Sequence, residues 1–515
     1  MRIEKFSITS SWKNLEGFSV NFDQSRDVAV LIGRNGTAKS NLLEALLWIF
    51  SKIDLGKPAP FSYKIVYRLA ETSVELTASV GRQPVAKLNG KTAKLNEIRA
   101  KYTPRHVVGY YSGVSDRFHE IFLEHDLQAR DQTLIEHAQE DSASTLDFRR
   151  FICARPVHGL FALLSFYFSD DKKVQNFLKD FTRITAFDSA LLIVRKPRWA
   201  QKGNNAEQFW GAKGPVRDLL ERYKKHCLAP FYRNVRVKTD FARAKTRELM
   251  YLFLPSIESL SALADEYNGN PQTLFQALDT MRLSELIEDF RVRVRVEGSS
   301  GAIHTRQLSE GEQQLLTVLG LMRFTRDAGS LYFLDEPDTH LNPAWTVQYL
   351  DLLRDIGGIE RNSHTLIATH DPLLVSGLVK EELRVLHRSK DGKIGASAPD
   401  EHPRGTGVAG VLTSELYGLE SQLDPFSMRV LKRIYEVSSE ENLNRRKRHL
   451  RRLGKLLPAI ETSETSPDPY RNIARDAYEK AQDLALDANI PTDRKLAIIE
   501  KLAQQLFENA KEDSK

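Results

Sequence analysis

The sequence predicts an α/β fold in which short buried strands form a sheet and helices pack against it. Three apolar runs carry this prediction: Asp27–Ile32, Leu331–Leu334 and His364–Ala368. Each has the length and composition of a strand that is buried on both faces. Polar residues follow each run at once, so the ends of these strands are the candidate functional positions.

Length and composition describe an ordinary globular protein. The chain has 515 residues, more than one hydrophobic core usually organises, so we expect two to four structural units. No apolar run approaches the ~18 residues of a membrane span, and Met1–Phe6 alternates like a strand instead of a signal peptide. We therefore expect a cytoplasmic protein without a membrane partner. The net charge of +6 permits contact with nucleic acid and does not demand it.

The run from Gly33 to Asn41 has the order of a phosphate-binding loop. It joins the first strand to a helix that is largely apolar from Leu42 to Phe50. In such a loop the backbone N–H groups and the helix N-terminus hold phosphate oxygens, Lys39 adds a positive charge and Ser40 offers a hydroxyl to magnesium. The expected nucleotide-binding residues are Gly33, Arg34, Asn35, Gly36, Thr37, Ala38, Lys39, Ser40 and Asn41.

Ala38 departs from the pattern G-x-x-x-x-G-K-S, which has glycine at this position. A methyl group fits only where the backbone tolerates a Cβ, so we expect an altered loop or a lowered nucleotide affinity. A strand-turn-helix with a chance Lys-Ser pair is the alternative interpretation of the stretch.

Two carboxylates, Asp335 and Glu336, end the strand Leu331–Leu334. Such a pair is costly to bury unless a cation neutralises it, so it indicates a metal ion or the magnesium of a nucleotide. A strand that runs into an acidic turn would explain the same residues. His370, after the third strand, is by itself an ordinary strand-end histidine.

Ser309 is a good N-cap for the largely apolar helix that follows it, and Glu312 completes a capping box. The same N-terminus can present Ser309 and backbone amides to a phosphate. A well-capped helix without a ligand is the alternative.

Taken in order, Gly33–Ser40, Leu308–Gln314, Leu334–Glu336 and Thr369-His370 resemble the motifs of ATP-binding-cassette (ABC) ATPases, over roughly 230 residues in two blocks. The resemblance implies an ABC-type P-loop nucleotide-binding domain of the AAA ATPase group, with ATP and Mg²⁺ as cofactors. Within this family, the motifs are most similar to those of the branch that includes recombination, repair and overcoming-lysogenization-defect ATPases.

The resemblance also implies a role for each motif residue. Ser40 and Asp335 would hold magnesium, Glu336 would polarise the attacking water as general base, and His370 would contact the γ-phosphate. The signature residues would reach the nucleotide of the opposite subunit, which makes a head-to-tail homodimer or a higher oligomer the competent unit. They are Leu308, Ser309, Glu310, Gly311 and Glu312, with Glu310 in place of the commoner glycine.

Asp338 and Thr339 resemble the loop that crosses between subunits in this family. No glutamine follows the buried strand near Tyr110, so the sequence names no sensor for the γ-phosphate. After His370 there is no Asp-x-Asp pair of the kind that overcoming-lysogenization-defect nucleases carry, so we do not expect the chain itself to be a nuclease.

The motifs divide the chain into four predicted parts. Residues 1–117 would hold the phosphate-binding loop and an antiparallel β subdomain, and 289–400 the signature, the acidic strand and the histidine. Residues 118–288 would form a mostly helical insertion with short strands, because scattered prolines exclude a long coiled coil. Residues 401–515 would form a helical partner-binding region.

Two basic clusters, Arg195–Trp199 and Arg222–His226, place aromatic residues beside Lys and Arg. Such segments can bind a nucleic-acid backbone. Alternatively, both clusters are charged surfaces exposed to solvent. Asp289–Val296 alternates strictly and predicts a strand with one charged face.

Tail motifs add a second resemblance. Gly407–Ser414, Leu416–Leu419 and Asp468–Tyr470, together with Tyr110–Gly113 and Thr37–Asn41, resemble PtuA-type ATPase subunits of Septu and retron-associated anti-phage defence systems. The resemblance implies a bacterial complex in which ATP state controls a separate His-Asn-His (HNH) nuclease. Retron versions add a reverse transcriptase with its DNA–RNA product, so nucleic acid would reach the chain through the complex.

Two classes of function remain open. A regulatory ATPase that positions a nuclease should bind DNA weakly by itself and co-purify with a partner. A DNA repair or recombination ATPase that resembles RecF and SMC proteins would clamp DNA in an ATP-dependent way, and its DNA binding should be tight and salt-sensitive.

Overall fold

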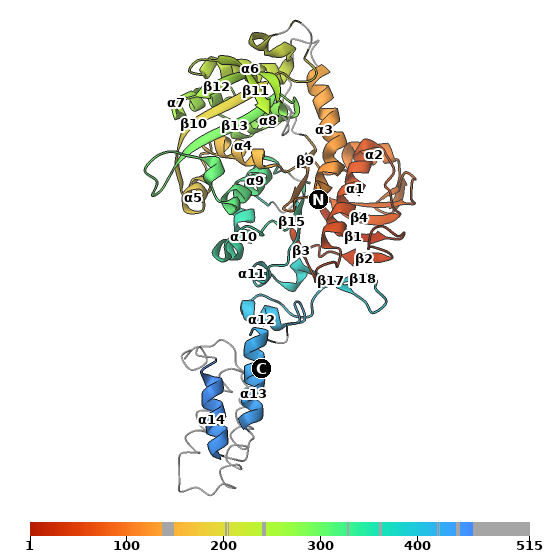
Figure 1. Ribbon diagram of the computed structural model, residues 1–515. Helices are drawn as coiled ribbons and strands as arrows, with labels where there is room; N and C mark the ends of the chain where they lie inside the picture. The colour runs from red at the N-terminus through yellow and green to blue at the C-terminus, as the bar shows by residue number, and fades with distance from the viewer. Residues whose placement is uncertain are drawn as a thin grey trace. The chain divides into compact units, whose positions relative to one another are not determined.

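In a computed structural model of the chain, the structure describes residues 1–135, 149–200, 203, 205–238, 244–326, 329–359, 363–419, 421, 423–438 and 443–456. The chain divides into two compact units, Met1–Gly405 and Thr406–Lys515. The first unit contains three β-sheets with helices between and around them (Figure 1).

A seven-stranded sheet lies at the centre of the first unit. In spatial order its strands are β18 (Ile394–Ser397), β17 (Leu383–Arg388), β3 (Val28–Ile32), β16 (His364–Ala368), β15 (Leu331–Asp335), β8 (Val107–Tyr111) and β9 (Phe151–Cys153). All neighbours are parallel except β17 and β18. The three predicted strands are β3, β15 and β16, and each of their residues is buried. The predicted α/β class is therefore confirmed.

A six-stranded antiparallel sheet stands beside the central one. It runs in the order β2 (Phe18–Asn21), β1 (Arg2–Ile8), β4 (Tyr63–Leu69), β5 (Thr72–Ala78), β6 (Val85–Leu88) and β7 (Lys91–Ala93), followed by α2 (Leu95–Lys101). Helix α1 (Lys39–Leu55) shares one hydrophobic core with residues of both sheets, among them Ile65 and Phe333. Its sequence is apolar on most sides because it is covered from two directions.

A lobe with a five-stranded antiparallel sheet occupies much of the region between the two motif blocks. The strands, in order, are β11 (Phe231–Lys238), β12 (Ala244–Leu254), β10 (Ile184–Arg195), β13 (Ile287–Val296) and β14 (Ile303–His304). The helices of this region are α3 (Arg117–Ile135), α4 (Pro156–Phe166), α5 (Lys172–Asp180), η1 (Ala206–Gly211), α6 (Gly214–His226), α7 (Ile257–Asp265) and α8 (Pro271–Leu283).

The lobe differs from the expected helical insertion with short strands. Strands β10 and β12 have 12 and 11 residues. Strand β13, expected to open the second motif block, pairs with β10 inside the lobe, while β9 joins the central sheet. The pairing of β10 with β13 joins residues about a hundred positions apart in the sequence, and that of β8 with β9 joins residues 44 positions apart. A local pattern carries no information about such partners.

The second motif block continues with η2 (Thr305–Gln307), α9 (Glu310–Phe324), α10 (Pro343–Asp355), α11 (Pro372–Val375) and η3 (Lys380–Glu382). Helix α9 packs very closely on α4. A Cβ added at Gly320 would lie 2.1 Å from the Cβ of Ala162, and one at Gly159 would lie 2.7 Å from Thr317 Oγ1. Glycine at both positions therefore lets the signature helix sit directly against the lobe.

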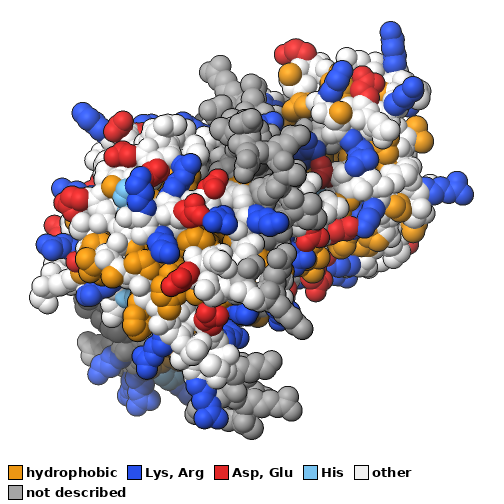
Figure 2. All heavy atoms as spheres, turned by 90° about the horizontal axis from the view of Figure 1, so that it is seen from above, with side chains coloured by type: hydrophobic (Ala, Val, Ile, Leu, Met, Phe, Trp, Pro, Cys, Tyr) orange, Lys and Arg blue, Asp and Glu red, His pale blue; other side chains and the backbone are white. Residues whose placement is uncertain are grey.

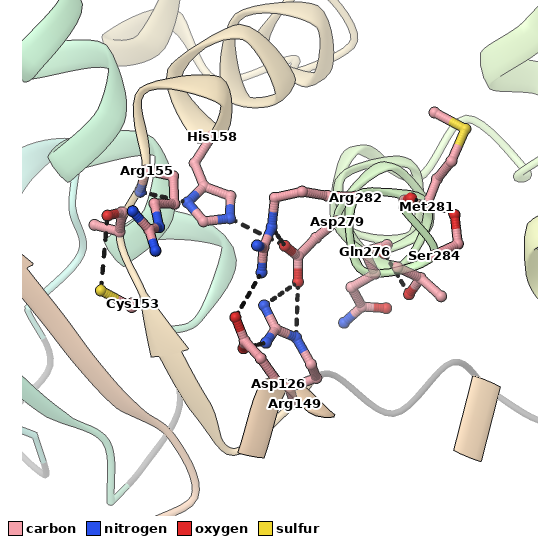
Figure 3. A network of polar contacts seen from close by, with 12 residues as sticks. Asp126, Arg149, Cys153, Arg155, His158, Gln276, Asp279, Met281, Arg282 and Ser284 are labelled. Carbon is pink, nitrogen blue, oxygen red and sulfur yellow. Dashed lines mark hydrogen bonds and ion pairs between the residues drawn. The ribbon is translucent and has the colours of Figure 1, made fainter. Parts of the chain in front are cut away.

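A buried polar network centred on Asp279 fastens the lobe to the central sheet (Figure 3). Asp279 accepts hydrogen bonds from Arg149, at 2.6 Å, and from Arg282, at 3.0 Å, and lies 3.0 Å from His158 Nε2. Arg149 also pairs with Asp126 of α3. Burial alone would raise the pKa of Asp279, but Arg149, Arg282 and His158 hold that pKa well below its ordinary value.

The second unit is helical where it is described, as predicted for 401–515. Its helices are α12 (Gly407–Thr413), α13 (Pro425–Ser438) and α14 (Leu443–Gly454). The tail motif Gly407–Ser414 corresponds to α12 and its C-cap, whereas Asp468–Tyr470 lies outside the described residues. None of the helices described in either unit combines the length and the apolar character that a membrane span requires.

Candidate functional site

The three strand-end motifs meet at one edge of the central sheet. Strand β16 lies between β3 and β15, with Leu31 opposite Ala368 and Ala368 opposite Asp335. The residues that follow these strands are therefore neighbours. The structure thus brings together the loop after Ile32, the carboxylates of Asp335 and Glu336, and His370, as the sequence predicted.

The phosphate-binding loop is closed by its own side chains. Lys39 Nζ donates a hydrogen bond of 2.8 Å to the carbonyl oxygen of Gly33, and Thr37 Oγ1 donates one of 2.7 Å to that of Arg34. A Cβ at Gly33 would lie 2.3 Å from the Leu386 carbonyl oxygen, so only glycine fits there. Arg34, Asn35 and Gly36 are exposed, which leaves the outer rim of the loop open to a ligand.

Ala38 adopts the left-handed conformation, with φ of 73° and ψ of 20°, immediately before helix α1. This is the position where the pattern has glycine, because L-residues with a Cβ reach such dihedrals only at a cost of about 1 kcal/mol. Ala38 therefore takes a conformation that glycine adopts freely, and its methyl group is accommodated in a buried position. The lowered nucleotide affinity stays a prediction.

Residues outside the motif form hydrogen bonds that support the phosphate-binding loop. The side-chain amide of Asn14 donates to the Gly36 carbonyl at 3.1 Å, and Asn41 donates to Asn14 Oδ1 at 2.5 Å. Arg117 of α3 donates to Asn41 and, at 2.7 Å, to Glu44. Sequence reasoning missed Asn14, Glu44 and Arg117, since they come from three separate segments and form no motif.

Asp335 has the properties of a magnesium ligand. The residue is 1% exposed, and within the described part of the chain neither carboxylate oxygen has a hydrogen-bond partner of normal geometry. Burial raises the pKa of Asp335 to about 6, against the opposing influence of the Ser40 hydroxyl and Lys39. A buried carboxylate beside a serine hydroxyl, with oxygen atoms left unsatisfied, fits a hard divalent cation such as Mg²⁺.

Replacing Asp335 with Asn should stabilise the protein in the absence of nucleotide and metal. Because the folded pKa lies above the unfolded value of 3.8, the ionised carboxylate opposes folding, and stability is lost as pH rises through about 6. We expect a gain on the order of 2 kcal/mol at pH 7.5, roughly half as large at pH 5. Urea unfolding at both pH values measures this gain.

The exposed Asp351→Asn substitution serves as the matched control and should change stability by less than about 0.5 kcal/mol at either pH. An unchanged or lowered stability of the Asp335→Asn variant at pH 7.5 would contradict the charged, unsatisfied state of this carboxylate.

Glu336 and His370 form a pair at the open side of the site. Glu336 Oε1 lies 3.1 Å from His370 Nδ1, and both side chains are partly exposed. Glu336 has a φ of 51°, an uncommon conformation for glutamate, and its N–H donates to the Ala368 carbonyl at 2.8 Å. This backbone turn directs the carboxylate away from the strand, where it can accept a proton from a water molecule.

The side chain of Asp338 is buried and hydrogen-bonded to Thr369 of the same chain. Thr369 Oγ1 donates to Asp338 Oδ2 at 2.5 Å, and the Asp371 N–H donates to Thr369 Oγ1 at 2.9 Å. Burial raises the pKa of Asp338 to about 6. Thr339, by contrast, is exposed. Of the two residues predicted for a subunit-crossing loop, Thr339 is thus the accessible one and Asp338 positions the loop.

The signature segment confirms the predicted capping box. The Glu312 N–H donates to Ser309 Oγ at 3.3 Å, and the Ser309 N–H donates to Glu312 Oε2 at 2.6 Å. Glu310, in the glycine position of the family pattern, lies 3.0 Å from His340 Nδ1. A Cβ at Gly311 would lie 2.6 Å from the His340 carbonyl oxygen, so this helix start is fitted against the loop after Glu336.

The signature segment makes its polar contacts away from the phosphate-binding loop of its own chain. Among the described residues, no hydrogen bond or ion pair joins Leu308–Glu312 to Gly33–Asn41. Ser309 and Glu310 are exposed. The N-terminus of α9 is therefore accessible at the surface of the chain.

Residues 162–376, fewer than half of the chain, match a family described as "AAA domain, putative AbiEii toxin, Type IV TA system". A curated relative, Septu protein PtuA of Bacillus mycoides (strain KBAB4), is 24% identical over 216 residues. The chain is similar to P-loop ATPases of the ABC and AAA kind and resembles PtuA. The match covers 40% of this chain and 30% of PtuA, so it spans less than a third of that relative's length.

Solved structures of ATPase head domains resemble this chain with lower sequence identity. The SMC head domain from Thermotoga maritima has a TM-score of 0.33 and 14% identity, covering 78% of this chain and 100% of that one. RecF in complex with ATP has a TM-score of 0.31 and 15% identity, covering 77% and 99%. At these TM-scores the likeness supports no further statement about the chain.

Proposed function

We propose that the chain binds and hydrolyses ATP as the regulatory subunit of a bacterial anti-phage defence complex. The observation that carries this proposal is the shared sheet edge, where Lys39, the unsatisfied Asp335 and the Glu336–His370 pair follow three neighbouring strands. A buried, unpaired carboxylate beside a phosphate-binding loop is expensive to maintain. A bound metal–nucleotide complex would neutralise this carboxylate and remove the unfavourable free energy of its burial.

Each residue then has a chemical task. Backbone N–H groups of Gly33–Ser40 and the Lys39 ammonium hold the phosphates, and Ser40 and Asp335 hold Mg²⁺. Bound magnesium supplies positive charge that offsets the charge of the phosphates. Glu336 accepts a proton from the attacking water, and His370 orients the Glu336 carboxylate through their 3.1 Å contact.

A second copy of the chain completes the site in this proposal. The exposed N-terminus of α9, with Ser309 and its neighbouring amides, suits the γ-phosphate of a nucleotide bound to the other copy. Isologous pairing of two chains forms two such sites at once. Thr339 of the exposed loop would lie in the interface between them.

The partner of this ATPase would be a separate HNH nuclease, whose activity the ATP-bound dimer restrains or positions. The resemblance to PtuA and the tail motif in α12 support this part of the proposal. Residues 401–515 would provide the partner-binding region, and the insertion 118–288 would add a further protein-binding surface. In a retron version, a reverse transcriptase with its DNA–RNA product would join the complex.

Purification from the native locus tests the proposal. The chain carries an affinity tag, and mass spectrometry identifies what co-purifies at moderate salt. We expect a small stoichiometric chain with an HNH pattern, and the Lys39→Ala variant shows whether its retention depends on ATP. A chain that comes alone and dimerises on DNA only with ATP would contradict the defence assignment and favour a repair-type clamp.

A further inference from the structure

One face of the lobe sheet is covered by helices, and the other is exposed along β13 and β11 but buried at Ser189, Ile193 and Leu249 between them; we call this second face the uncovered face. Along β12, Met250, Leu252 and Leu254 are fully buried, and helices α4 and α6 pack on this sheet. Successive residues of a strand point to opposite faces, so the residues between them belong to the other side. On β13 that other side presents Arg291, Arg293 and Arg295, and all three are exposed.

Strand register continues the uncovered face across the whole sheet. Arg291 lies opposite Leu191 of β10, Leu191 opposite Phe253 of β12, and Tyr251 opposite Phe231 of β11. Residues that face one another across strands share a side of the sheet. The uncovered face therefore has a row of arginines along β13 and apolar or aromatic side chains along β12 and β11.

Positive charge dominates this face. Its cations are Arg195, Arg233, Arg247, Arg291, Arg293 and Arg295, and its acids are Glu288 and Asp289. Glu288 is already paired with Arg195 and Arg247, and Asp289 with Arg291. In the described part of the chain, Arg233 and Arg295 have no ion-pair partner, so the positive charge on the face is not neutralised internally.

Aromatic rings lie next to these cations. Phe231 is 56% exposed, and its ring centroid lies 5.9 Å from that of Tyr251, which is half-buried. The exposed ring of Phe231 offers a face on which an unpaired base can stack. Seen from above in Figure 2, hydrophobic side chains gather in patches between Lys and Arg side chains over the surface of the molecule.

We propose that the uncovered face of the lobe sheet binds single-stranded nucleic acid. Alternate arginines on β13 are about 6.6 Å apart along the strand, which lets them contact successive phosphates of an extended chain. The aromatic rings offer faces on which unpaired bases stack, a contact that a duplex does not allow. The inference goes beyond the proposed function, because it uses none of the ATP-site residues.

Of the two basic clusters expected from sequence, Arg222–His226 is a poorer site than this face, and Arg195 of the other cluster belongs to the face itself. Lys225 and His226 both contact Glu266, and Arg222 donates to the Glu266 carbonyl and lies over the Tyr267 ring. Trp199 donates its indole N–H to the Ser284 carbonyl at 2.8 Å. The side chains of Arg222, Lys225 and His226 are thus engaged within the lobe, whereas Lys196 and Arg198 are exposed beside Arg195.

Fluorescence anisotropy with a labelled 20-nucleotide DNA strand tests the inference on the full chain without ATP. The triple variant Arg291→Ala, Arg293→Ala and Arg295→Ala should bind at least ~10-fold more weakly at low salt, with a salt slope smaller by about 2. A control triple, Lys91→Ala, Lys94→Ala and Lys101→Ala, removes the same charge from exposed positions of the first unit and should bind like the wild type.

Phe231→Ala separates stacking from charge. It should weaken binding of the single strand about 5-fold and leave binding of the matching duplex unchanged. The proposal is overturned if the wild type does not bind the strand, if both triples lose affinity equally, or if the arginine triple affects only binding to phosphatidylserine vesicles. None of these results depends on ATP hydrolysis, so they remain distinct from failure of the proposed function.

Discussion

ATP hydrolysis by the Glu336→Gln variant is expected to fall at least ~100-fold, while ATP binding stays within about 2-fold of the wild type. The amide keeps the size and the turn of the backbone but cannot accept a proton from water. Phosphate release measures hydrolysis, and a fluorescent ATP analogue measures binding. Because the variant retains bound ATP, light scattering after gel filtration should show a dimer that persists with ATP and Mg²⁺.

The matched control is Glu97→Gln, an exposed glutamate in the first turn of α2, which should hydrolyse ATP like the wild type. His370→Ala should reduce hydrolysis less than Glu336→Gln, since His370 orients the base instead of acting as it. Near-normal turnover by the Glu336→Gln variant would show that another group activates the water.

Removing the carboxylate at Asp279 is expected to cause the largest loss of stability. Asp279→Ala leaves Asp126 as the one acid, among the described residues, paired with both Arg149 and Arg282, and breaking such a buried network costs about 3–5 kcal/mol. The loss should appear as a lower urea midpoint for the transition of the first unit. It should also loosen β9, which begins two residues after Arg149, from the lobe.

The exposed pair Lys173–Asp355 provides the control, because Asp355→Ala should cost less than about 1 kcal/mol. The pH dependence has a definite sign. The folded pKa of Asp279 is depressed, so its contribution is complete above the unfolded value near 3.8 and disappears as pH falls through the folded pKa. A loss below about 1 kcal/mol for Asp279→Ala at neutral pH would mean that the network adds little stability.

Local patterns were sufficient to predict the central sheet and its motifs. Strands β3, β15 and β16 are short and wholly buried, so their apolar runs were unmistakable. The capping box at Ser309 depends on residues three positions apart and was equally clear. The sequence also marked Ala38 as the departure from the glycine pattern, and the structure adds that this residue is left-handed.

Non-local features could not be predicted in this way. Strand β13 alternates strictly, and its charged face was foreseen, but its pairing with β10 depends on a segment about a hundred residues earlier. Asn14 and Arg117, which support the phosphate-binding loop, come from separate segments of the chain. The Asp279 network likewise joins residues of different helices. Each of these residues is unremarkable in its own stretch of sequence.

Hydrolysis by a mixture of two inactive variants tests the central claim, an ATP site completed by a second copy of the chain. Lys39→Ala removes the phosphate-binding charge, and Ser309→Glu places a repelling charge at the N-terminus of α9, where a carboxylate still favours the helix. Alone, each variant should be inactive. An equal mixture should regain about a quarter of the wild-type rate, because about half of the dimers are mixed and each has one intact site. A mixture as inactive as its components, or a fully active Ser309→Glu variant, would contradict the account.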